Sequence, residues 1–300
     1  MKAQKSVAFK FSLAMIVALL SLPVLVFAQG PPMPLTVKPL HGGVYWSSGG
    51  DGGNTGFIVG KGGVIVIDAK TTPASARDFL AQIAKVTSEP VTTVILTHSD
   101  ADHVNGLAAF PKGMTIIAQE GCKKEIEESL TGPEPSPRDY FPNHTVKNKE
   151  VTTIDGVRLE LLHWVPAHTS GDLITYLPAQ KIVFTGDIVA AMPGQMYTGI
   201  HPAKHGSSAG WIETMKGILA LDADTFVPGH GDLQTRADLE ARLARVEQRR
   251  AQIFQLAAQG KSLDQVKQAL NDTSKDTVLP NGLVFPTFTE VVYMEATKKN

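Results

Sequence analysis

Four potential metal ligands lie within six consecutive residues, in the segment His98-Ser99-Asp100-Ala101-Asp102-His103. The segment directly follows residues 91–97, a run of apolar and β-branched residues that predicts a buried strand. Burying so many ionisable groups is costly unless something binds them. Imidazoles and carboxylates together bind divalent metal ions. We therefore interpret this segment as part of a metal site.

Three further polar residues follow predicted strands in the second half of the chain. They are His168, Asp187 and His230. Catalytic groups that collect from several strand ends are typical of layered α/β enzymes. The spacing therefore predicts that these three side chains join the first cluster in one site.

The elements that must position these residues follow from hydrophobic period and turn signals. In the first half we expect a β-meander, a helix, a buried strand and a short helix that begins at Val104. The second half repeats sheet and helix, and the chain is helical beyond residue 231. The expected strands are 43–46, 55–59, 63–68, 91–97, 157–162, 173–177, 181–185 and 224–227, and the expected helices are 74–87, 104–108, 209–220, 236–259 and one that Ser262 caps.

The ordered set of motifs resembles that of the metallo-β-lactamase-fold metallohydrolases, in particular the glyoxalase II-like general hydrolases. The resemblance implies an α/β fold, a four-layer αβ/βα sandwich, with additional C-terminal helices. We expect a catalytic domain over 29–235 and a helical extension over 236–300 that packs on it. The matching segments are His98-Ser99-Asp100-Ala101-Asp102-His103, Pro166-Ala167-His168-Thr169-Ser170-Gly171-Asp172, Thr185-Gly186-Asp187 and Pro228-Gly229-His230-Gly231.

The resemblance also implies a ligand set for two divalent metal ions. One metal would take His98, Asp100 and His168. The other would take Asp102, His103 and His230, and Asp187 would bridge the two metals. Asp102 would in addition orient the nucleophile and carry a proton. We expect zinc, with iron or manganese as alternatives.

Asp100 departs from the resembled pattern, which has histidine at this position. Three carboxylates and a bridging hydroxide balance two divalent cations. The metal cluster would then be neutral, whereas a second histidine would leave it with one positive charge. The expected consequences are a weaker Lewis acid and greater tolerance for harder metals.

The predicted function is hydrolysis of an ester, thioester, lactone or amide by a metal-bound hydroxide. Hydrolysis of β-lactams is one alternative. An iron-dependent oxidoreductase is another, because related flavodiiron-type proteins carry a carboxylate at the position of Asp100. A non-catalytic binding module is the third. Specificity should lie in the loops 46–54, 131–147 and 193–208.

The N-terminal residues 1–28 predict a secretory signal peptide. Lys2, Lys5 and Lys10 precede the apolar stretch 11–27, and a small-x-small cleavage site ends at Ala28. An uncleaved membrane anchor is the alternative. We expect a periplasmic or secreted protein without stable membrane association after cleavage.

The composition bounds the partners of the chain. The formal net charge of the whole chain is −1, which gives no basis for binding nucleic acid. A small-molecule substrate is therefore expected. The single cysteine, Cys122, excludes an internal disulfide, and we interpret it as structural.

Overall fold

A computed structural model describes residues 34–129, 140–194, 196–197, 199–278 and 284–298. The predicted signal peptide and most of the predicted loop 131–147 lie outside these residues. Among the described helices, none is both long and apolar enough to cross a membrane.

The first sheet has seven strands in sequence order. Its second to fourth strands form the predicted antiparallel meander, an unpredicted first strand pairs with the second, and the last three strands add in parallel. Parallel neighbours need crossover connections, which here contain the helices. The strands are β1 (Thr36–Pro39), β2 (Val44–Ser48), β3 (Thr55–Val59), β4 (Val64–Ile67), β5 (Val91–Ile95), β6 (Thr115–Gln119) and β7 (His144–Val146), and the helices are α1 (Pro73–Val86), α2 (Ala101–Val104), the 3-10 helix η1 (Asn105–Ala109) and α3 (Glu120–Ser129).

The second sheet has five strands in the order β12-β11-β10-β9-β8. All its pairs are antiparallel except β11 and β12, which run parallel because α4 connects them. The strands are β8 (Lys149–Ile154), β9 (Val157–Leu162), β10 (Ile174–Leu177), β11 (Ile182–Ala191) and β12 (Thr225–Gly231), and the helix is α4 (Ser208–Leu219).

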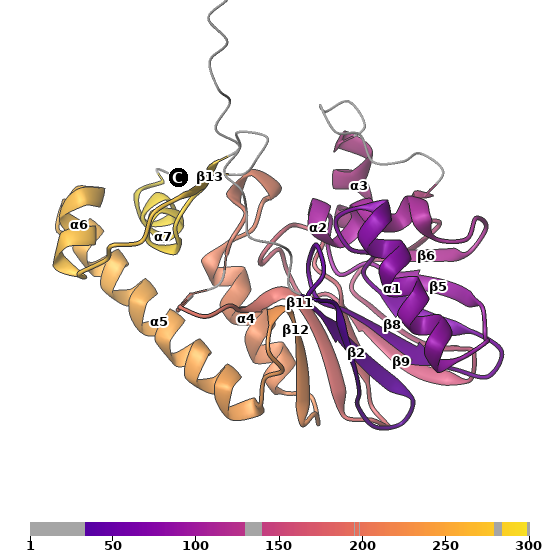
Figure 1. Cartoon of the computed structure of the whole chain (residues 1–300). Helices are drawn as coiled ribbons and strands as arrows, with labels where there is room; N and C mark the ends of the chain where they lie inside the picture. Colours follow the sequence, from indigo (N-terminus) through magenta and orange to yellow (C-terminus); the bar gives the residue numbers. More distant parts are fainter. Residues whose placement is uncertain (1–33, 130–139, 195, 198, 279–283, 299–300) are drawn as a thin grey trace, which may run out of the picture. The chain divides into compact units, whose positions relative to one another are not determined.

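Alternation along the strands divides the buried side chains into layers. Ile65 and Ile67 of β4 face the second sheet, where they pack with Leu161 and Phe184. Their neighbours Val64 and Val66 instead pack with α1. The outer face of the second sheet packs against α4 and the C-terminal helices. The result is the predicted αβ/βα sandwich, and Figure 1 shows α1 beside β5 and α4 beside β11.

The C-terminal part contributes to the same core. Its helices are α5 (Arg236–Ala258), α6 (Leu263–Ala269) and α7 (Phe288–Thr297). Leu239, Val246, Val266 and Val292 from these helices are buried with Trp211 of α4. These helices thus share the hydrophobic core of the second sheet. The predicted domain boundary at residue 235 remains a prediction.

Several predicted boundaries are wrong in an informative way. The short helix expected from Val104 begins at Ala101, so that Asp102 and His103 lie inside α2. Asp187 and His230 were expected after strands, but both lie within the paired strands β11 and β12. The chain after residue 231 also contains a hairpin of β13 (Thr277–Val278) and β14 (Val284–Phe285), where only helices were expected.

Candidate metal centre

The seven predicted ligands converge at one edge of the sandwich, and both sheets contribute to them. His98 follows β5, and α2 supplies Asp102 and His103 in the loop region of the first sheet. Asp187 and His230 come from adjacent strands of the second sheet. The register between these strands shifts around Asp187, and such irregularities re-aim side chains next to active sites.

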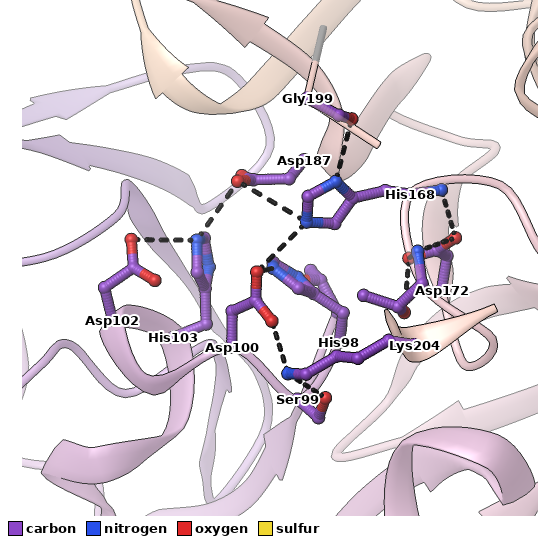
Figure 2. A network of polar contacts seen from close by, with 12 residues as sticks. His98, Ser99, Asp100, Asp102, His103, His168, Asp172, Asp187, Gly199 and Lys204 are labelled. Carbon is purple, nitrogen blue, oxygen red and sulfur yellow. Dashed lines mark hydrogen bonds and ion pairs between the residues drawn. The ribbon is translucent and has the colours of Figure 1, made fainter. Parts of the chain in front are cut away.

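The inner triplet, defined as His98, Asp100 and His168, is the more buried half of the cluster. Asp100 Oδ2 lies 3.1 Å from His168 Nε2 and 3.6 Å from His98 Nε2. The exposed fraction of the side chain is 1% for His98, 18% for Asp100 and 3% for His168. One carboxylate oxygen and two imidazole nitrogens therefore face one point (Figure 2).

The outer triplet, defined as Asp102, His103 and His230, repeats this chemistry closer to solvent. Asp102 Oδ2 lies 3.1 Å from His230 Nε2 and 3.6 Å from His103 Nε2. The Asp102 side chain is 37% exposed and the His230 side chain 24%. Asp102 is thus the most accessible carboxylate of the cluster.

Asp187 lies between the two triplets. Its carboxylate oxygens are 3.4 Å from the Nε2 atoms of His103 and His230 and 4.0 Å from that of His168. A side chain on Gly229 would place its Cβ 1.9 Å from Asp187 Oδ1, so glycine is required beside this carboxylate. The position of Asp187 is the one that a bridging ligand needs.

The donor set fits divalent metal ions by a direct criterion. His98 Nε2 is buried and has no hydrogen-bond partner among the described residues. Buried polar nitrogens are normally satisfied, so an unpaired one that faces two other ligand atoms indicates a site for a cation. The nitrogen and oxygen donors together suit zinc, iron or manganese.

The buried carboxylate of Asp68 orients one histidine in each triplet. His103 Nδ1 lies 2.7 Å from Asp68 Oδ2. His98 Nδ1 lies 2.9 Å from the hydroxyl of Thr97, and that hydroxyl donates to Asp68 Oδ2 at 2.7 Å. These contacts fix both rings with Nε2 toward the cluster, as bound histidines in metal sites require.

A different set of contacts holds His168. Its Nδ1 lies 2.9 Å from the carbonyl oxygen of Gly199. Asp172, at the end of the same motif, accepts hydrogen bonds from the backbone N–H groups of Ala167, His168 and Thr169. Asp172 therefore fixes the loop of the inner triplet, as Figure 2 shows.

The glycine-rich loop between β2 and β3 contacts the outer triplet. The N–H of Gly53 donates to the carbonyl of Asp102 at 3.1 Å, and a Cβ on Gly53 would lie 2.3 Å from the His103 ring. The ammonium of Lys70 is buried and donates to the carbonyls of Gly49 and Gly53 at 2.8 Å. Burial lowers the pKa of Lys70 to about 8, against the attraction of Asp51 and other carboxylates.

The carboxylates of the cluster are strongly acidic. Burial would raise the pKa of Asp187, but the charges of His230 and His103 hold it well below its usual range. Burial would likewise raise the pKa of Asp100, yet hydrogen bonding from His168 outweighs this effect and lowers it well below its usual range. Both groups are therefore anionic at neutral pH.

The pKa values of two histidines of the cluster are raised. The charge of Asp187 is the largest influence on His230 and raises its pKa to about 10. Burial would lower the pKa of His168, but Asp100 raises it to about 9. These rings hold protons that a divalent cation would have to displace.

A cavity of about 520 Å³, within the usual size range of small-molecule sites, lies between the segment after β11 and the C-terminal part, and none of the seven predicted ligands is among the described residues that line it. Two of its lining residues, Gly199 and Phe285, also contact His168. The centroid of the Phe285 ring is 6.3 Å from that of His168 and 5.0 Å from that of His201. Gly194, Met196, Tyr197 and Gly199 of the predicted specificity loop 193–208 thus line the cavity, and Gly199 also contacts a predicted ligand.

Sequence reasoning missed four residues that organise the cluster. Asp68 follows a buried strand in the way His98 does, which was a usable signal. Asp172 lies in a motif already identified by its histidine. Gly53 and Lys204, which pairs with Asp100, lie in the predicted specificity loops 46–54 and 193–208, but their individual roles were not predicted because their partners are distant in sequence.

Comparison with known proteins gives several similar chains. A 2,4-dinitroanisole O-demethylase subunit alpha from Nocardioides sp. (strain JS1661) is 31% identical over 69% of this chain and 61% of that protein. A linear primary-alkylsulfatase from Pseudomonas sp. (strain ATCC 19151) is 22% identical over 56% of this chain and 39% of its own length. A hydroxyacylglutathione hydrolase from Brucella ovis is 28% identical over 48% and 49%. The matches thus span about 40–60% of these relatives.

Solved structures support the fold. A sec-alkylsulfatase from Pseudomonas sp. aligns with a TM-score of 0.70 and 19% identity, over 87% of this chain and 50% of that one. A metallo-beta-lactamase from Pontibacter korlensis aligns with a TM-score of 0.61 and 21% identity, over 71% and 99%. The model of the metallo-beta-lactamase superfamily matches residues 48–230, the span that contains every predicted ligand. The chain therefore belongs to the metallo-beta-lactamase superfamily, a family of metal-dependent hydrolases.

Proposed function

We propose that the protein is a hydrolase with two divalent metal ions, preferentially zinc, that cleaves an ester, thioester, lactone or amide of a small molecule. The observation that carries the proposal is the convergence of four imidazole nitrogens and three carboxylates in two triplets joined by Asp187. The inner triplet would hold one metal and the outer triplet the other. Two such ions supply a hydroxide nucleophile near neutral pH and polarise the bond that is cleaved.

The protein side chains would perform the remaining tasks. Asp102 is the most accessible carboxylate, and its pKa is lowered, because the charge of His103 outweighs the effect of burial. It is therefore anionic and reachable from solvent, so it would orient the nucleophile and would hold a proton only in transit to solvent. The cavity next to Phe285 would receive the part of the substrate that does not react.

The names of the relatives widen the range of substrates to test. They act, by name, on an aryl ether, an alkyl sulfate and a glutathione thioester. We therefore include a sulfate ester and a nitroaryl ether beside the carboxylic esters, thioesters and lactones.

The test combines metal analysis with a substrate panel. Elemental analysis of the purified protein should give two equivalents of zinc, and hydrolysis of a panel member should stop on chelation and return with added zinc. A chromogenic cephalosporin in the panel tests β-lactam hydrolysis. Iron with oxygen consumption would instead support the oxidoreductase. Fewer than one metal equivalent and no turnover would refute the proposal.

We further propose that residues 1–28 direct export to the periplasm or beyond. Support comes from the three lysines that precede the apolar stretch and from the small residues before Gln29. Cell fractionation and N-terminal sequencing test this. A product that starts at Gln29 outside the cytoplasm supports export, and a full-length cytoplasmic product contradicts it.

A further inference from the structure

The two oxygens of Asp100 face different partners. Oδ2 points into the inner triplet, 3.1 Å from His168 Nε2. Oδ1 points away from it and accepts a hydrogen bond from the ammonium of Lys204 at 2.5 Å (Figure 2). Asp100 can therefore bind a metal through one oxygen while the other stays paired with a cation.

Lys204 is held in this position from several sides. It ends a short 3-10 helix, η3 (Pro202–Lys204). The N–H of His201 donates to the carbonyl of His168 at 2.8 Å, which anchors this segment to a ligand of the inner triplet. The ammonium also donates to Ser99 Oγ at 2.8 Å, and Ser99 in turn donates to Glu125.

Backbone contacts also anchor the loop that carries Lys204. Besides His201, the N–H of Ser207 donates to the carbonyl of Ala167 at 2.9 Å, and Gly206 is pressed against His168. The pair of Asp100 and Lys204 is largely enclosed, with side chains 18% and 25% exposed, so the charge of Lys204 acts on the triplet with little screening by solvent.

We infer that Lys204 restores to the metal cluster the positive charge that Asp100 removes. A histidine at position 100 would be a neutral ligand, whereas Asp100 brings one negative charge. The ammonium in contact with Asp100 Oδ1 cancels that charge. The inner triplet together with Lys204 therefore has the same net charge as a triplet of three neutral histidines.

This inference differs from the expectation of a neutral cluster with a weakened Lewis acid, which stays a prediction. It rests on the proposed two-metal function, because the charge balance matters only when cations are bound. Lys204 is a positioning residue that acts through Asp100. If Lys204 acts in this way, the affinity for zinc should rise when the cluster loses a positive charge and fall when it gains one.

The experiment measures zinc affinity by competition with a chromogenic chelator. In Lys204→Met and Lys204→Gln the cluster loses one positive charge. The zinc ion in the inner triplet should therefore bind about tenfold more tightly. Asp100→His leaves Lys204 unpaired beside two cations and should weaken zinc binding about tenfold. The double variant Asp100→His/Lys204→Met should return to within a few-fold of the wild type.

Two control variants complete the design. Lys204→Arg keeps the charge and should keep wild-type affinity. Lys216→Met removes another ion-paired lysine, 2.7 Å from Glu247 on the helical face, and should change nothing.

The outcomes separate the two proposals. If the wild-type protein binds no zinc, the proposed function and the inference both fail. If the wild-type protein binds two zinc ions but both neutral Lys204 variants bind zinc equally or less tightly, only the inference is overturned.

Discussion

The inner and outer triplets contain the same side chains, two histidines and one aspartate, yet their surroundings differ. The inner carboxylate is 18% exposed and paired with Lys204, and the outer one is 37% exposed and pairs with His103 and His230. The inner triplet is thus enclosed and charge-compensated, while the outer triplet faces solvent. The comparison shows that one donor set occurs in two environments, an enclosed one beside a lysine and an open one with an accessible carboxylate.

The largest effect should follow from removing the residue that the triplets share. Asp187→Asn keeps the shape but removes the charge that lies between them. Metal content should fall below two equivalents and kcat/KM by about 10³-fold, since metal chemistry supplies several kcal/mol. Elemental analysis and steady-state kinetics check this. Retention of two metals with full activity would show that the triplets do not need a bridge.

Removing the metals should change how stability depends on pH. In chelator-treated protein, the raised pKa values of about 9 for His168 and about 10 for His230 mean that the protonated rings stabilise the fold fully below the ordinary pKa of 6.5. This contribution is lost as the pH rises through 9 and 10. The metal-loaded protein should behave oppositely, because zinc requires deprotonated rings.

Thermal unfolding of both forms between pH 6.5 and 10 tests this linkage. The difference in Tm between loaded and chelated protein should widen as pH rises. A constant difference would mean that the two rings are not protonated in the chelated protein.

The orienting carboxylates distinguish the triplets next. Asp68 contacts a histidine of the outer triplet and, through Thr97, one of the inner triplet. Asp68→Asn should therefore lower the affinity for both metal ions by about 10–100-fold. Asp172 fixes only the loop that carries His168, so Asp172→Asn should lower the affinity for the metal ion of the inner triplet alone. Zinc titrations resolve the two steps. Equal effects of both variants on both metals would contradict this division.

The smallest effect should come from the cavity wall. Phe285→Ala removes an aromatic ring that lines the cavity and contacts His168. KM should rise about tenfold for the preferred substrate, with kcat and metal content little changed, because only apolar contact is lost. An unchanged KM would place the substrate on the outer side of the cluster.

The site residues that could be predicted from the sequence can each be identified from neighbouring residues or from the order of the motifs. His98 and Asp102 stand beside an apolar run whose strand character can be read directly, and the motif order identified His168, Asp187 and His230. The same reasoning placed strands β4 and β5, because continuous apolar runs predict buried parallel strands.

The residues that it missed depend on contacts between distant segments. Lys204 meets Asp100 across 104 positions, and no local pattern predicts that pairing. Helix α7 falls within the predicted helical extension, and the capping box of Thr287 and Glu290 was a usable signal for where it begins. The hairpin before it was not predicted, because its strands have two residues each and are too short to show a period.

The origin of the ligands from two sheets has a consequence for folding. Asp187 and His230 are aligned by the parallel pair β11 and β12, whereas His98 and His103 follow a strand of the other sheet. Such distant segments meet late, since closing long loops costs entropy before any contact compensates it. We therefore expect the chain to acquire high zinc affinity only in the last stage of folding, so that metal uptake reports a completed sandwich and cannot nucleate it.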